Sequence, residues 1–155
     1  MIPFLRVMIR IISKPEDTVD DIEEFLTHIS CIDTKKEKVP IQKDSFVNAR
    51  EETQYIYTLI LEKKRHVRKF TENFFQSLPI AAHQTLLEQI QERIDDECRF
   101  YLRLQKKSAF QHAYELTDSG DCVHFTFVVE AHPARKERAV GAVESFLNTQ
   151  MKNTI

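Results

Sequence analysis

The stretch Tyr55-Ile56-Tyr57-Thr58-Leu59-Ile60-Leu61 is an apolar run with the length and aromatic content typical of a buried strand. It leads directly into a basic cluster and then into two segments with helical spacing of apolar residues, which predict a pair of helices. The second helix is expected to stop at or before Asp95, because acids oppose the dipole at a helix C-terminus. A second strand, Arg99 to Leu104, follows. The apolar positions are Val67, Phe70, Phe74 and Phe75 in the first helix and Leu86, Leu87, Ile90 and Ile94 in the second.

The N-terminal part of the chain predicts another strand and helix. Phe4 to Ile12 alternates apolar and polar side chains with a period of two, which is the pattern of a half-buried strand. Ser13 and Glu16 have the spacing of a capping box, so we expect a helix to begin at Ser13. The buried stripe of this helix would consist of Val19, Ile22, Phe25, Leu26 and Ile29.

Four further segments complete the predicted fold. Val39 to Val47 is a candidate strand. Residues 113–116 and Cys122 to Glu130 are predicted to pair as a hairpin, because the sequence Asp118-Ser119-Gly120-Asp121 between them favours a tight turn. Arg135 to Asn148 has the pattern of an amphipathic helix.

This order of elements, with one-sided alternation in several strands, predicts the α+β class. The expected architecture is a two-layer sandwich in which helices pack on one face of a mixed, mainly antiparallel sheet. At 155 residues the chain is predicted to be a single domain, residues 1–155. A hydrophobic content of 42%, with 11 phenylalanines, is enough for a sizeable core.

The charge of the chain is unevenly distributed. The formal net charge of −2 does not by itself predict a polyanion partner. However, residues 62–112 carry a net charge of +3, whereas residues 1–61 carry −3 and residues 113–155 carry −2. The basic excess is therefore local, which indicates either a surface for a polyanion or an ordinary solvated helix face.

The cysteine content and the N-terminus indicate a cytoplasmic protein. Cys31, Cys98 and Cys122 are odd in number and far apart, which is typical of reduced thiols in the cytosol. The apolar N-terminal stretch contains Arg6 and Arg10, so it lacks the uninterrupted core of a signal peptide. No apolar run approaches the roughly 20 residues that span a bilayer.

The sequence contains no constellation of catalytic residues. The pairs His28 and Cys31, and Cys122 and His124, each supply two metal ligands, fewer than the four of a structural zinc site. A G-x-S-x-G motif, a phosphate-binding loop and a paired-aspartate metal motif are all missing. We therefore expect no enzyme activity, no metal and no cofactor.

Two basic clusters flank the predicted pair of helices, and they hold nine of the 22 lysines and arginines. In the second cluster, bases and an aromatic residue alternate on one strand face, as they do on surfaces that hold phosphates and stack bases. Folding would have to bring the two clusters together. The predicted nucleic-acid-binding residues are Lys63, Lys64, Arg65, Arg68, Lys69, Arg99, Tyr101, Arg103, Lys106 and Lys107, with Arg6 and Arg10 as helpers on the outer face.

Two motifs resemble an archaeal family described as RNA-binding or as exosome-associated subunits. The first is Arg99-Phe100-Tyr101-Leu102-Arg103-Leu104-Gln105-Lys106-Lys107-Ser108-Ala109-Phe110 with the following Leu116-Thr117-Asp118-Ser119-Gly120-Asp121, and the second is Leu61 to Phe70. The resemblance covers nearly the whole chain. It implies a fold like that of ribosomal protein L5, RNA as the partner and a role near RNA-processing or RNA-degrading machinery. The chain departs from the family at Asn48 to Gln54, where the family has a glycine and this sequence has none.

A second class of function is open at this stage. A sheet with an exposed outer face or edge also suits a protein–protein interaction module, without nucleic acid. Such a module would pair with a second copy of itself, as a homodimer, or with a protein complex.

Overall fold

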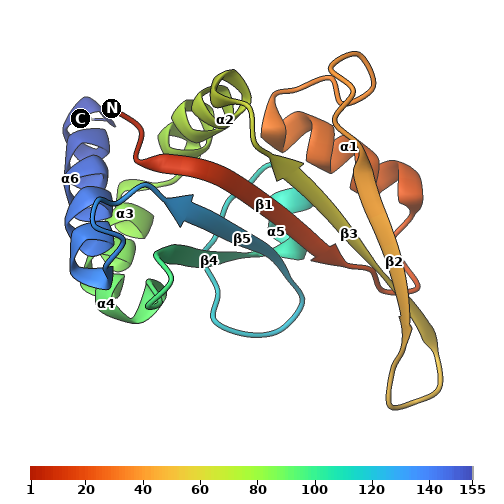
Figure 1. Ribbon diagram of the computed structural model, residues 1–155. Helices are drawn as coiled ribbons and strands as arrows, with labels where there is room; N and C mark the ends of the chain where they lie inside the picture. Colours follow the sequence, from red (N-terminus) through yellow and green to blue (C-terminus); the bar gives the residue numbers. More distant parts are fainter. Residues whose placement is uncertain (155) are drawn as a thin grey trace.

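The computed structural model describes residues 1–154, which form a five-stranded sheet and six helices (Figure 1). The strands are β1 (Phe4–Ile12), β2 (Ile41–Val47), β3 (Thr53–Leu61), β4 (Arg99–Gln105) and β5 (Cys122–Val129). The helices are α1 (Val19–Ser30), α2 (Lys64–Ser77), α3 (Ile80–Glu88), α4 (Ile90–Arg93), α5 (Lys106–Phe110) and α6 (Lys136–Thr154).

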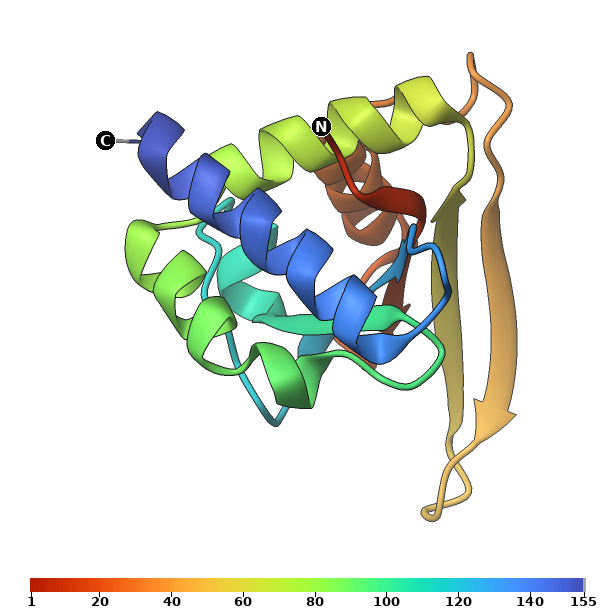
Figure 2. The ribbon, with the colours of Figure 1, turned by 60° about the vertical axis from the view of Figure 1, so that its left-hand side comes forward.

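The sheet has the strand order β2-β3-β1-β5-β4, and every neighbouring pair is antiparallel. Figure 1 looks onto the face of the sheet that carries no helix, and Figure 2 shows the helices gathered on its other side. The predicted α+β sandwich with helices on one face is confirmed. Within residues 1–154, no parallel pair occurs, although we expected a mixed sheet.

The core forms where the apolar side of the strands meets α2. Phe70 and Phe74 lie against Phe125 with ring centroids 6.2 and 4.9 Å away, and Phe75 lies 5.6 Å from Phe127. All five rings are buried. Full burial of one such side chain contributes about 1.5–3 kcal/mol, so the helical spacing of phenylalanines in α2 anchors the helix to the sheet.

The cap of α1 differs from the prediction. Thr18, not Ser13, is the N-cap, and its hydroxyl accepts a hydrogen bond of 3.1 Å from the backbone N–H of Asp21. Ser13 still belongs to the end of the sheet, because its N–H donates to the carbonyl of Tyr55 and its hydroxyl accepts from the N–H of Tyr55. The helix therefore starts later than predicted, and Val19 is 44% exposed instead of buried.

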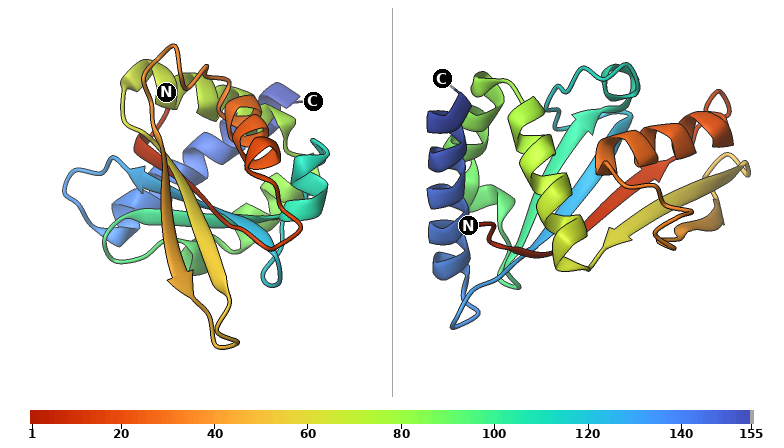
Figure 3. Two further views of the ribbon diagram at one scale, coloured as in Figure 1. Left: turned by 90° about the vertical axis from the view of Figure 1, so that its right-hand side faces the viewer. Right: turned by 90° about the horizontal axis from the view of Figure 1, so that it is seen from above.

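The predicted hairpin does not form. Residues 113–116 contribute an isolated bridge between Leu116 and Leu104, and β5 pairs with β1 and β4 instead. Both edges of β5 are occupied by these two long strands, so no edge is left for a hairpin partner. The segment from Asp118 to Asp121 bends, without a backbone hydrogen bond that closes a turn, and Gly120 has a φ of +83°, a conformation that glycine adopts without strain. Figure 3 shows the loop that precedes β5 from two further directions.

A buried histidine in α3 predicts acid sensitivity. The side chain of His83 is fully buried, and neither ring nitrogen has a hydrogen-bond partner among the described residues. Burial lowers the pKa of His83, and backbone carbonyls of Phe75 and Pro79 offset this only in part. Below about pH 6.5 the His83 side chain is protonated in the unfolded chain but resists protonation in the folded chain. Stability is therefore lost as the pH falls through that value.

We expect a His83→Phe variant to show a weaker pH dependence of the unfolding free energy than the wild type between about pH 7.5 and 5.5. Urea unfolding at several pH values measures this dependence. His132→Phe is the matched control, because the His132 side chain is 85% exposed. An unchanged pH dependence in His83→Phe would contradict this explanation.

Candidate nucleic-acid interface

The first basic cluster lies at the start of α2 and is open to solvent. The N-cap residue makes no side-chain cap, and the first turn contains no acid. Among the described residues, only Arg65 in this cluster makes an ion pair, 2.9 Å from Glu37. We call this set the α2 cluster; its five exposed members are Lys63, Lys64, Arg65, Arg68 and Lys69.

The position of the α2 cluster is electrostatically unfavourable without a ligand. The N-terminus of a helix carries a partial positive charge, so cations there cost a few tenths of a kcal/mol each. The free N–H groups of the first turn and the cations above them can instead share one anion, as helix N-termini do with phosphate groups. The cluster is thus suited chemically to an oxyanion.

A second group of cations crosses the helix-free face of the sheet. Arg10 in β1 is opposite His124 in β5, and His124 is opposite Arg103 in β4. Paired residues share a face, so these three side chains lie side by side. Burial lowers the pKa of His124, and the two neighbouring guanidinium groups lower it further. His124 is therefore neutral at pH 7, and the row carries two positive charges.

Arg99 and Tyr101 also lie on this outer face but are engaged with acids. Arg99 contacts Asp95 at 3.0 Å and Glu97 at 2.5 Å, and the Tyr101 hydroxyl donates to Asp95 at 2.8 Å. Although burial raises the pKa of Asp95, hydrogen bonds from the Arg99 backbone, Tyr101 and other groups hold it below its usual value. Arg99 therefore offers little free positive charge, whereas the Tyr101 ring stays 38% exposed.

Lys106 is not a surface cation, contrary to the prediction. Its side chain is 2% exposed, and its Nζ donates to the carbonyl of Ile12 at 2.6 Å. Nζ also lies 2.8 Å from Asp17 and 2.7 Å from Asp121. These three acceptors satisfy the ammonium group completely, so Lys106 is a structural residue. The neighbouring Lys107 is exposed.

The fold brings together only part of the predicted site. The strand register places Leu61 beside Val7 at one end of the sheet, and Gln105 beside Cys122 at the other end. The α2 cluster is therefore at the end opposite Lys107. Arg6 links the α2 cluster to the outer face, since its guanidinium lies 3.8 Å from Glu62, just before the cluster.

The sequence analysis identified Arg10 and Arg103 but missed His124 as their neighbour. The polar positions of each strand are visible as the alternate residues of a period-two pattern. Which strands lie side by side is not visible in that pattern, because the sheet order β2-β3-β1-β5-β4 joins segments far apart in the sequence.

The described part of the chain holds no group of three or more histidines, cysteines, aspartates or glutamates that could bind a metal ion. Cys122 Sγ and His124 Nε2 lie 3.3 Å apart, without a third ligand within residues 1–154. None of the described helices combines the length and the apolar character needed to cross a membrane.

The structure defines an α+β protein with a bare sheet face and a cationic helix start. Residues 6–129 match the model of a family described as RNA binding, and the chain belongs to this family. It is also 31% identical over 87 residues to RNA-binding protein PAB1135 of Pyrococcus abyssi, strain GE5/Orsay. That alignment spans 56% of this chain and 56% of the relative, so the chain covers little more than half of the curated protein. The predicted resemblance to an archaeal RNA-binding family is confirmed.

Solved structures show the same fold. Mth689, a DUF54 protein from Methanothermobacter thermautotrophicus, is 20% identical with a TM-score of 0.76, over 93% of this chain and 98% of that one. SSO0741 from Sulfolobus solfataricus is 10% identical with a TM-score of 0.75, over 97% and 99% of the two chains. At these identities the likeness concerns the fold alone.

Proposed function

We propose that the protein binds RNA through the phosphate backbone and catalyses no reaction on it. The observation that carries the proposal is the α2 cluster, where exposed cations gather at the positive end of a helix dipole with no acid in the first turn. Membership of the RNA-binding family and the name of the Pyrococcus relative support RNA as the polyanion.

The proposed contact surface runs from the α2 cluster over Arg6 to the row of Arg10 and Arg103 on the bare sheet face. Cations would hold phosphates along this path, and the exposed ring of Tyr101 would stack a base. Lys107 would contact RNA that extends past the far end of β4. Lys106 is withdrawn from the proposed site because its ammonium group is buried, and Arg99 is a minor member because two acids hold it.

Association with RNA-processing or RNA-degrading machinery is a further part of the proposal and rests on the family resemblance alone. The likeness of the fold to ribosomal protein L5 is also part of the proposal, and it too rests on the family resemblance alone. A protein that positions RNA for another enzyme needs a phosphate-binding surface but no catalytic group of its own, which agrees with the chemistry of the residues described above.

Titration of a structured RNA at several salt concentrations tests the proposal. Because cations that contact phosphates release counterions, the logarithm of the binding constant should fall linearly and steeply with the logarithm of the salt concentration. A filter or gel assay measures the binding constant. If no binding occurs at low salt, RNA binding is wrong and the α2 cluster is only a solvated surface.

Self-association is a second candidate, favoured by the free edge of β2. This strand pairs only with β3 among the described residues, and Val47 near the tip of the hairpin is 66% exposed. An antiparallel pair of two β2 strands centred on Ser45 would place Lys43 opposite Val47 and Asp44 opposite Phe46, so no like charges would face each other. Light scattering after size-exclusion chromatography measures the oligomeric state, and a monomer at all concentrations excludes this candidate.

A further inference from the structure

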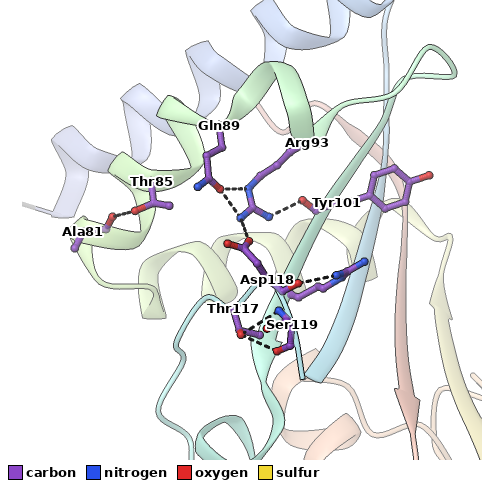
Figure 4. Close-up of polar contacts among 9 residues, drawn as sticks. Ala81, Thr85, Gln89, Arg93, Tyr101, Thr117, Asp118 and Ser119 are labelled. Carbon is purple, nitrogen blue, oxygen red and sulfur yellow. Dashed lines mark hydrogen bonds and ion pairs between the residues drawn. The ribbon is translucent and has the colours of Figure 1, made fainter. Parts of the chain in front are cut away.

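A cavity lies at the outer edge of β4, between the isolated bridges that Ile94 and Leu116 form with this strand. It has a volume of about 300 Å³, and its lining includes Gln89 and Arg93 from the α3–α4 region, Arg103 from β4 and Asp118 from the following loop. Figure 4 shows the guanidinium of Arg93 between Gln89 and Asp118, while the ring of Tyr101 points away from these side chains. Arg103 and Tyr101, which also line the cavity, belong to the contact surface proposed above, whereas Gln89, Arg93 and Asp118 have no role in it.

Arg93 is an unusually buried cation for a surface cavity, since its side chain is only 12% exposed. Its guanidinium donates to the neutral side-chain oxygen of Gln89 at 2.6 and 2.9 Å and to the carbonyl of Tyr101 at 3.3 Å. Burial lowers the pKa of Arg93 despite the nearby Asp118. Neutral acceptors therefore fix the position of the guanidinium, but they do not neutralise its positive charge.

The anionic partner of Arg93 is poorly placed. The Asp118 carboxylate lies 3.4 Å from Arg93 Nη2 and is 83% exposed, whereas strong charge-assisted hydrogen bonds are about 2.7–2.9 Å long. Because the carboxylate is mostly in water, solvent screens its attraction to the buried guanidinium. Arg103 faces the same loop, because its Nη1 donates to the Asp118 carbonyl at 3.1 Å. Glu92 also lines the cavity. When Asp118 is displaced, Arg93, Arg103 and Glu92 together give the cavity a net charge of +1.

We propose that this cavity binds a phosphate group of the RNA, and that Asp118 occupies the phosphate position on Arg93 when RNA is absent. The inference rests on the proposed RNA-binding function and adds a specific subsite to it. A guanidinium fork suits two oxygens of a phosphate better than one distant carboxylate oxygen. Binding would swing the exposed Asp118 side chain into solvent and retain the hydrogen bonds of Arg93 to Gln89 and Tyr101.

Two sources of phosphate share this chemistry. An internal phosphodiester would reach the cavity as the RNA leaves the bare face past Arg103, and a 5′-terminal phosphate would enter it end-on. The same RNA with and without a 5′-phosphate distinguishes these sources. If Asp118→Asn tightens binding only of the RNA that carries a 5′-phosphate, the cavity holds the terminal phosphate. If it tightens binding of both RNAs equally, the cavity holds an internal phosphodiester.

The test is a double-mutant cycle on RNA affinity. Asp118→Asn should tighten binding by about tenfold, because it removes the competing charge and keeps the shape of the side chain. In an Arg93→Gln background the same change should have no effect. Arg93→Lys is the second background, which keeps the charge and removes the planar fork, and urea unfolding confirms that each variant is folded.

Glu144→Gln on α6 is the matched control, since Glu144 is exposed and its loss changes the net charge equally. The inference is overturned if Asp118→Asn tightens binding no more than this control does, or if the gain persists without Arg93. Either result leaves RNA binding by the α2 cluster intact. If the wild type binds no RNA, the proposed function fails, and this inference fails with it.

Discussion

A Lys106→Met variant is expected to lose about 3–5 kcal/mol of unfolding free energy, because removing one partner of a buried ion pair leaves the other charges without compensation. The lost ammonium group satisfies Asp17, Asp121 and the Ile12 carbonyl at once. Small domains are stable by about 5–15 kcal/mol, so this single substitution would remove a large part of the total. The midpoint and slope of urea unfolding measure the loss.

Two controls separate burial of charge from loss of the lysine stem. Lys107→Met changes the exposed neighbour in the same short helix, and we expect it to alter stability by less than about 0.5 kcal/mol. Adding Asp17→Asn and Asp121→Asn to Lys106→Met should restore part of the stability, since the uncompensated carboxylates are then gone. Equal losses in Lys106→Met and Lys107→Met would contradict the structural role of Lys106.

The case of Lys106 shows why the sequence predicted the fold better than the site. In sequence, Lys106 and Lys107 are equivalent members of a basic pair at the end of a strand. The difference between them arises from Asp17, which is 89 residues away along the chain. Short-range patterns report strands and helices because these depend on neighbours in sequence, whereas the partner of a charge depends on the tertiary fold.

The outer face illustrates the same limit. The period-two alternation in β4 separates Phe100, Leu102 and Leu104, which are buried in the core, from Tyr101 and Arg103, which lie on the outer face. The cavity beside Arg93 could not be predicted, because helical spacing around Ile90 and Ile94 identifies the buried stripe but not which polar neighbour meets β4. Loop residues such as Asp118 carry no periodic signal at all.

Reversing two charges of the α2 cluster, with Lys64→Glu and Arg68→Glu together, should weaken RNA binding on the order of a hundredfold and reduce the salt slope by about two. Both side chains are exposed and lie four residues apart, on one face of α2. A gel or filter assay over a range of salt concentrations measures both quantities.

The same double variant should keep about the stability of the wild type, which makes its loss of binding informative. A glutamate at position 64, in the first turn of α2, interacts favourably with the helix dipole, and the repulsion between Lys64 and Arg68 is replaced by an equivalent one between two glutamates. RNA binding is therefore expected to fall while the unfolding free energy stays nearly constant, which a damaged fold cannot produce. Arg135→Glu with Arg138→Glu changes the net charge equally at the start of α6, where both side chains are exposed. If that control weakens RNA binding as much as the α2 variant, the effect reflects overall charge, and the α2 cluster is not the binding site.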